Sequence, residues 1–317
     1  MFYTDEAVNS LLSYSKMLVD QLNKYKTCPQ QLNALQYVVF AGMISYYGFE
    51  YVDTIYRAFA GPNFYYTTSS LEEIMKSNNL FDPGIEKTLG NGEVGAFVLF
   101  RLEKNCFGNL RINRDIYVID ELGTKPDELV EKLIHEVNHV VNSINNPVCI
   151  RNGKQAVRNG LSVIEVDDSN RSYNMLEEAV NVLQSAEIME HVLAFTQYDI
   201  KDPDVKRMLD KIKYAFGSKR DGLGYEVIVP TVRPLFLNPD FKKVVKRQRM
   251  VGRIVPIKQN FEDKVGSGSY SEFCKSLDDL EASCNSFWSR AFYDSKAKTY
   301  IKAYNKWYNW IRTKNNI

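Results

Sequence analysis

Two histidines and one glutamate stand close together in the segment His135-Glu136-Val137-Asn138-His139. On an α-helix, residues four positions apart lie on the same face, so the two imidazoles could bind one cation together. The glutamate beside the first histidine could then act as a general base towards a water molecule. The chain has three histidines in all, and its composition predicts roughly 0.002 occurrences of this pattern by chance. The alternative interpretation is an accidental match on a structural helix.

A catalytic zinc site needs a third protein ligand, because it normally combines three such ligands with one open position. The third histidine of the metzincin pattern is excluded, since Asn142 and Asn145 occupy the positions where that pattern has glycine and histidine. A carboxylate farther along the chain is the common remaining solution. The segment that begins at Met175 offers two adjacent candidates, Glu177 and Glu178.

Helical spacing favours Glu178 as this ligand. It shares a stripe with apolar residues, and a carboxylate on a core-facing stripe is costly unless it is paired or bound to a metal. Glu177 lies on a more polar stripe, which favours a solvated position. The alternative for Glu178 is a buried ion pair. The apolar stripe holds Met175, Val182, Ala186, Met189 and Leu193, and the polar stripe holds Asn181, Gln184 and His191.

The motif lies in a segment whose own pattern predicts a helix. Thr124-Lys125-Pro126-Asp127 has the hydroxyl, the first-turn proline and the acid of a helix start, and Asn145-Asn146-Pro147 marks its end. Before this helix, residues 96–100 and 115–119 have the branched and aromatic composition of strands. We therefore expect a mainly helical α+β fold class, with a small β-sheet over the helix that carries the motif.

The remaining elements complete a division into three parts. Two Asn-Gly steps within 148–168 predict a hairpin, and a helix over 174–195 follows it. We expect a helical amino-terminal region at 1–92, with helices near Thr4, after Pro29 and near Ser70. A zinc-binding catalytic core would occupy 93–200, and a helical carboxy-terminal lobe 201–317.

An H-E-x-x-H helix followed by a second helix with a glutamate just before alanine resembles the gluzincin class of zinc metallopeptidases. The likeness covers about residues 110–195. It implies a gluzincin-like fold in which His135, His139 and Glu178 bind Zn²⁺ and Glu136 is the catalytic base. It also implies that strands before the first helix line the substrate cleft. The expected reaction is hydrolysis of peptide bonds.

The sequence departs from the thermolysin-like members of that class. Glu177 stands where they have asparagine, and Val182 stands where they have an aspartate that supports a ligand histidine. The groups that orient the ligands are therefore unassigned. The donor to the oxyanion is also open: Tyr225 is the candidate, with Tyr173 and Arg158 as alternatives.

The third histidine, His191, is not a candidate for that role. It would lie roughly 20 Å beyond Glu178 along the same helix. We therefore expect His191 to be structural.

Overall charge gives no sign of a strongly charged partner. Lys+Arg number 40 and Asp+Glu number 39, a formal net charge of +1, so we expect neither nucleic acid nor a membrane surface as partner. The basic run from Lys242 to Lys258 is interpreted as a solvated face. The expected partner is a peptide or protein substrate.

The start of the chain, Met1–Glu6, is acidic rather than basic, and no apolar run is long enough to cross a bilayer. Five scattered cysteines fit reduced thiols. We therefore expect a cytoplasmic zinc-dependent hydrolase. Two alternatives stay open: an effector or toxin protease delivered by a non-classical route, and a catalytically inactive gluzincin-like protein that serves as a binding or scaffold protein.

Overall fold

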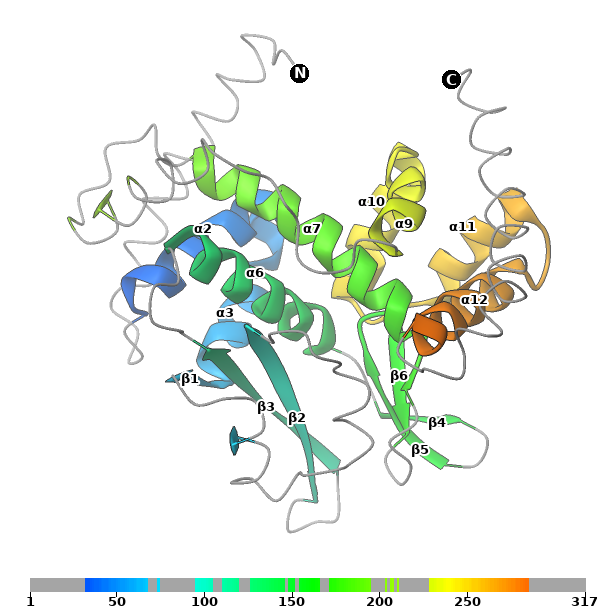
Figure 1. The fold of residues 1–317 in the computed structure, drawn as a ribbon, viewed down its shortest axis with the longest axis horizontal. Coiled ribbons are helices and arrows are strands. Elements are labelled where there is room, and N and C mark those ends of the chain that lie inside the picture. Colours follow the sequence, from blue (N-terminus) through cyan, green and yellow to red (C-terminus); the bar gives the residue numbers. More distant parts are fainter. Residues whose placement is uncertain are drawn as a thin grey trace, which may run out of the picture.

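The structure, a computed structural model, describes residues 32–67, 73–74, 95–104, 110–119, 126–145, 148–151, 154–165, 171–194, 203, 206–207, 210 and 228–284. Within these residues helices predominate and strands form two small sheets, as an α+β, mainly helical fold requires (Figure 1). None of the helices described has both the length and the apolar composition needed to cross a bilayer. The helix expected near Thr4 and most of the helix expected near Ser70 lie outside the described residues.

A three-stranded sheet lies against the helix that carries the motif (Figure 1). Its strands are β1 (Asn63–Thr67), β2 (Ala96–Lys104) and β3 (Leu110–Ile119). The order is β1-β3-β2, with β1 parallel and β2 antiparallel to β3. Helix α6 (Pro126–Ser143) packs on β2 and β3, which confirms the small sheet expected over this helix.

Strand β1 corrects the purely helical interpretation of the first 92 residues. It is a short, aromatic-rich segment that pairs with β3, from Asn63 opposite Asp115 to Thr67 opposite Ile119. The side chain of Asn63 also donates a hydrogen bond to Asp115 over 2.9 Å. The sequence did not reveal β1 because its side chains do not alternate between buried and exposed, and because its parallel partner comes much later in the chain.

Helices α2 (Ala34–Tyr47) and α3 (Val52–Ala60), joined by a 3-10 turn at Phe49–Tyr51, pack beside α6. A capping box starts α2, because the side chain of Asn33 accepts from the Gln36 N–H while the side chain of Gln36 accepts from the Asn33 N–H. Contacts with α3, α6 and α7 bury α2 on nearly every side. Its polar residues are thereby placed in the protein interior.

The segment expected to form a hairpin is a four-stranded antiparallel meander. Its strands, in spatial order, are β4 (Val148–Arg151), β5 (Lys154–Asn159), β6 (Ser162–Glu165) and β7 (Arg171–Ser172). The second Asn-Gly step forms the turn between β5 and β6, where Gly160 has φ of +57°. That left-handed conformation favours glycine.

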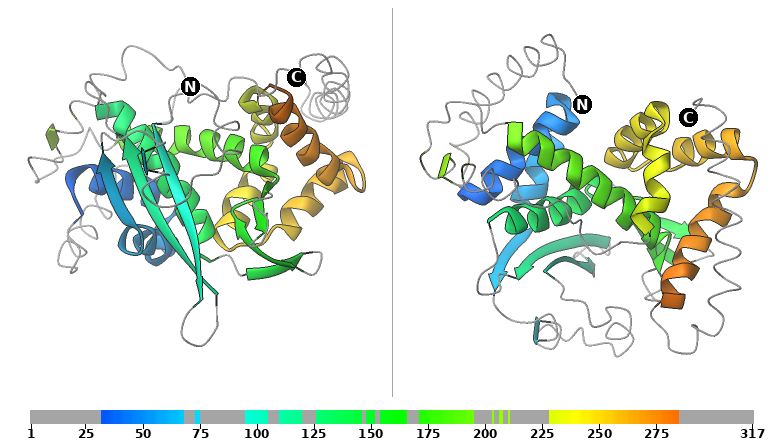
Figure 2. Two further views of the ribbon diagram at one scale, coloured as in Figure 1. Left: turned by 60° about the horizontal axis from the view of Figure 1, so that its bottom comes forward. Right: turned by 45° about the horizontal axis from the view of Figure 1, so that its top comes forward.

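Helix α7 (Asn174–Ala194) runs from the side of α2 and α6 to the side of the carboxy-terminal helices (Figure 2). Its later residues join a core with α2, α3, α6 and the first sheet, and its earlier residues join a second core with the carboxy-terminal helices. Four helices occupy residues 228–284. They are α9 (Ile228–Phe236), α10 (Pro239–Met250), α11 (Val255–Val265) and α12 (Ser269–Cys284).

Candidate metal centre

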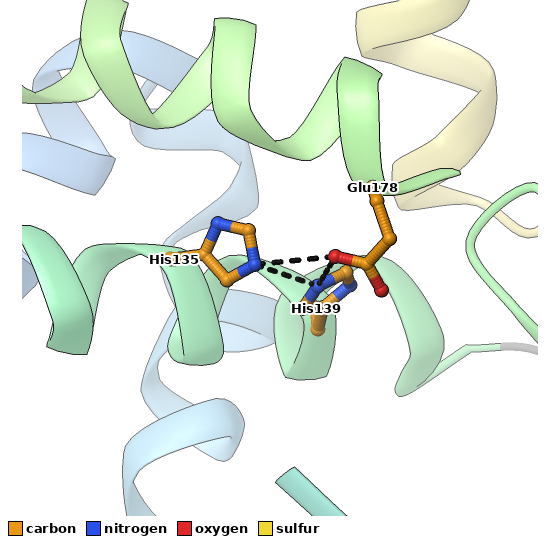
Figure 3. A group of neighbouring side chains, drawn as sticks. All are labelled: His135, His139 and Glu178. Atoms are coloured by element: carbon orange, nitrogen blue, oxygen red, sulfur yellow. Dashed lines mark hydrogen bonds and ion pairs between the residues drawn. The ribbon is translucent and has the colours of Figure 1, made fainter. Parts of the chain in front are cut away.

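The two motif histidines meet one glutamate between α6 and α7 (Figure 3). Nε2 of His135 and Nε2 of His139 lie 3.2 Å apart, and Oε2 of Glu178 lies 3.3 Å from each of them. Both histidines are buried, and the Glu178 side chain is 15% exposed. The three atoms form a nearly equilateral triangle that could hold a metal ion.

Helix geometry explains why these side chains converge. His135 and His139 are one turn apart, so both extend from the side of α6 that packs against α7. Glu178 is near the start of α7, and Figure 3 shows it pointing down towards the two imidazoles. The expectation that these three residues lie together is confirmed.

The donor set and its spacing are compatible with a divalent cation. Nδ1 of His139 lies 3.1 Å from Oε1 of Glu177, so in the neutral ring Nδ1 carries the proton and Nε2 carries a lone pair. Four tetrahedral ligands about 2.0–2.1 Å from zinc would be roughly 3.3 Å apart. The observed separations of 3.2 and 3.3 Å match this value.

Electrostatics favour a positive charge at the same point. Burial disfavours protonation of His139, but the carboxylates of Glu178 and Glu177 outweigh burial and raise the pKa of His139 to about 10. Burial likewise opposes ionisation of Glu178, but His139 and His135 outweigh it and hold the pKa of Glu178 well below its usual value. In the metal-free chain a proton supplies the charge, and a bound cation would replace that proton.

Glu136 lies beside the triangle. It is 7% exposed and interacts electrostatically with His135, His139 and Glu178. Its carboxylate also accepts a hydrogen bond from the backbone N–H of Val98 on β2. Burial raises the pKa of Glu136, although the two histidines oppose the shift. A raised pKa makes a carboxylate a stronger base, which suits the role predicted for Glu136.

Glu177 is not solvated, as its position on the polar stripe had suggested, but fully buried. Its Oε1 contacts Nδ1 of His139 and forms an ion pair with Arg249, and its Oε2 accepts from the Leu161 N–H over 2.7 Å. The prediction failed because the polar stripe of α7 is buried, with Asn181 and Gln184 also inaccessible to solvent. Glu177 thus orients His139, a function the sequence left unassigned.

Arg249 also corrects the interpretation of the basic run as a solvated face. Arg249 as a whole residue is 1% exposed. Within the same run, Lys242 contacts Glu187 and Lys246 contacts the carbonyl of Tyr46. Other members of the run are exposed, including Lys243, Arg247, Arg253 and Lys258. The spacing of charges alone gave no signal of this division, because the partners lie on other helices.

Amide side chains hold the two ligand-bearing helices together. Nδ2 of Asn181 donates to the carbonyl of His135 over 2.8 Å, and Nδ2 of Asn138 donates to Oδ1 of Asn181 over 2.7 Å. The Tyr47 hydroxyl donates to Oδ1 of Asn138, and Nδ2 of Asn142 donates to the Tyr47 hydroxyl over 3.0 Å. The spacing of residues in the sequence did not predict that Asn138 and Asn142 of the motif helix would form hydrogen bonds to other helices.

The start of α7 is anchored by the carboxy-terminal lobe. Asp278 of α12 accepts hydrogen bonds from the backbone N–H groups of Tyr173 over 2.7 Å and of Met175 over 3.1 Å. Tyr173 has φ of +63°, an unfavourable value for a residue with a side chain. Asp278 therefore caps the first turns of α7, which carry Glu178, although it comes from a distant helix rather than from the residues next to α7.

The oxyanion donor stays a prediction. Tyr225 lies outside the described residues. The ring of Tyr173 packs against Tyr270, with centroids 6.3 Å apart. Arg158 is half-buried on β5, and its Nη1 has no hydrogen-bond partner among the described residues.

Comparisons with protein family models, with curated proteins and with solved structures found no match to this chain. The likeness to gluzincins therefore depends on the motif and on residues that the structure brings together. Those residues form a candidate metal site whose ion is not identified by the geometry alone.

Proposed function

We propose that this protein is a zinc-dependent hydrolase, and specifically a metallopeptidase. His135, His139 and Glu178 would bind Zn²⁺, with Glu136 as general base. The observation that carries the proposal is the triangle of ligand atoms beside a buried carboxylate of raised pKa. Three protein ligands leave one position open on tetrahedral zinc. When bound, the ion would act as a Lewis acid that activates water and polarises a carbonyl group.

The chain's own groups would carry the protons. Glu136 would accept a proton from the attacking water and deliver it to the leaving amine. Its position one residue after His135 places it beside the triangle. Glu177 would keep the Nδ1 proton of His139 in place throughout, because an ionised carboxylate only accepts hydrogen bonds.

Strand β2 supports a peptide as the substrate. It forms one edge of the three-stranded sheet, and the N–H of Val98 on this strand reaches Glu136. The strand therefore runs next to the candidate centre. An extended peptide could pair with such an edge through backbone hydrogen bonds, which would hold it beside the general base.

Metal analysis and a peptide-library digest of the purified full chain test this proposal. We expect one zinc per chain and cleavage of a subset of peptides. Glu136→Gln should keep the zinc and lose turnover by about 100-fold to 10,000-fold. Glu128→Gln, at an exposed position on the same helix, is the matched control and should retain both.

The outcomes separate the alternatives. Absence of stoichiometric zinc after growth with the metal would refute the zinc centre. Stoichiometric zinc without cleavage of any peptide would contradict the peptidase assignment and favour the inactive binding or scaffold protein. Equal loss of turnover in Glu128→Gln would show that the effect of Glu136→Gln is not specific.

A further inference from the structure

Arg249 of α10 is a buried arginine that reaches the surroundings of the candidate metal centre. Its Nη1 donates to Oε1 of Gln184, and its Nη2 forms an ion pair with Oε1 of Glu177. Burial of a guanidinium is costly unless its charge is paired and its donors are satisfied. Glu177, which is also fully buried, supplies that opposite charge.

Glu177 connects Arg249 to His139. The same oxygen, Oε1, contacts Nη2 of Arg249 and lies 3.1 Å from Nδ1 of His139. An ionised carboxylate has no hydrogen to donate, so Nδ1 must be the donor in the second contact. In the neutral ring, Nε2 of His139 then presents its lone pair towards Glu178 and His135.

The β5–β6 turn holds Glu177 from another direction. Oε2 accepts from the N–H of Leu161 over 2.7 Å. A Cβ atom at Gly160 would collide with the Glu177 carboxylate, so the turn closes directly over it. The carboxylate is thus held between a strand turn, His139 on α6 and Arg249 on α10.

We propose that Arg249 is a positioning residue for the metal centre. It fixes Glu177, which in turn keeps the His139 proton on Nδ1 and Nε2 available for the ion. Because it requires an ion at the triangle, this proposal rests on the proposed function. The proposal gives the helical carboxy-terminal lobe a direct part in the site, because Arg249 lies on α10, far along the chain from the ligand-bearing helices α6 and α7.

A buried ion pair that serves stability alone would have different consequences. Removing Arg249 would then destabilise the fold without a specific effect on metal binding by the folded protein. A positioning role predicts that the metal-binding effect depends on Glu177. A double-mutant cycle with metal affinity as its readout separates the two.

The cycle uses full-length wild type, Arg249→Met, Glu177→Gln and the double variant. Zinc affinity is measured by competition with a chromophoric chelator, and ligand geometry by the visible absorption of the Co²⁺-loaded proteins. Arg249→Met should lower zinc affinity about 10-fold to 100-fold and alter the cobalt bands. In the Glu177→Gln background the same change should alter affinity by less than about threefold. Arg249→Lys should restore most of the affinity, and Arg247→Met, exposed on the same helix, should have none of these effects.

Wild-type zinc affinity and cobalt bands in folded Arg249→Met would overturn the proposal, as would an equal loss in both backgrounds. If Arg249→Met does not fold, the decision passes to Glu177→Gln and Arg249→Lys. The first must lower affinity and shift the cobalt bands, and the second must stay within about threefold of wild type; any other result overturns the proposal. Failure of wild type to bind either metal would instead refute the proposed function.

Discussion

Histidine and carboxylate side chains gather near each end of helix α7, in two different environments. Near its start, Glu178 faces His135 and His139. Near its end, His191 and Glu187 lie beside α2 and α10. Both groups are partly or fully buried between helices. The two groups contain the same residue types, but these residues have different hydrogen-bond partners.

The group near the end of α7 is satisfied by protein donors. The hydroxyl of Ser45 lies 2.8 Å from Nδ1 of His191, and the hydroxyl of Tyr46 donates to Glu187 over 2.9 Å. Lys242 forms an ion pair with Glu187. Burial, reinforced by Lys246 and Lys242, lowers the pKa of His191 to about 4. This environment excludes further positive charge, and it agrees with the structural role expected for His191.

At the group near the start of α7, the carboxylates of Glu178 and Glu177 outweigh burial and raise the pKa of His139 to about 10. A histidine and a carboxylate therefore indicate a cation site only when their lone pairs converge and the local charge is negative. We expect the two ends of α7 to respond differently to the same substitutions.

Equivalent changes to the two glutamates should give the largest difference. Glu178→Gln removes an anionic ligand and should weaken zinc binding by more than about 100-fold. Glu187→Gln should leave zinc affinity unchanged, because Glu187 contacts Tyr46 and Lys242 instead. Chelator competition measures both. Loss of zinc in Glu187→Gln with retention in Glu178→Gln would reverse the assignment of the third ligand.

Zinc binding should strengthen as pH rises from about 6.5 to 8.5, because proton and metal compete for His139. The folded-state pKa of about 10 exceeds the ordinary value of 6.5. Protonation of His139 therefore stabilises the metal-free fold fully below 6.5, and this contribution is lost as pH rises through about 10. Each proton displaced changes the free energy of zinc binding by about 1.4 kcal/mol per pH unit. Thermal melts with and without zinc measure the trend, and a zinc-induced stabilisation that shrinks with rising pH would contradict it.

Removing the anchor at the start of α7 should have a smaller effect. Asp278→Asn weakens the acceptor for the N–H groups of Tyr173 and Met175, at a cost of about 1–2 kcal/mol in the free energy of unfolding. Urea denaturation measures this, with Asp279→Asn, exposed on the same helix, as control. Equal effects of the two substitutions would show that Asp278 is not a specific cap.

The smallest effect is expected at the satisfied end of α7. Ser45→Ala removes the hydroxyl beside His191 and should cost about 0.5–1.5 kcal/mol of stability, the usual value for one hydrogen bond. Zinc affinity should not change. A clear loss of zinc affinity in Ser45→Ala would mean that the two ends of α7 are coupled.

The sequence predicted the parts of the site that follow from local helix geometry. The spacing of His135 and His139 and the apolar stripe of Glu178 both depend on one helical period. Glu177 and Arg249 could not be predicted in this way, because each is buried by a partner from a distant part of the chain. A polar stripe and a basic run usually indicate solvent, and here both contribute to an interior network.

The same limit applies to the fold. The motif helix, the strands before it and the Asn-Gly turn between β5 and β6 carry local signals, and the structure contains them. Strand β1 has no comparable signal, since it is ordered by pairing with β3. The capping of α7 by Asp278 likewise requires α12 to be in place. Interactions between distant segments thus complete a site whose ligands were locally encoded.

X-ray absorption at the zinc edge of the purified full chain tests the metal centre most directly. We expect four nitrogen or oxygen ligands about 2.0–2.1 Å from zinc, with scattering from two imidazoles in wild type and one in His139→Ala. A zinc ion bound through sulfur at about 2.3 Å, or a wild-type spectrum unchanged by His139→Ala, would contradict a centre built from His135, His139 and Glu178.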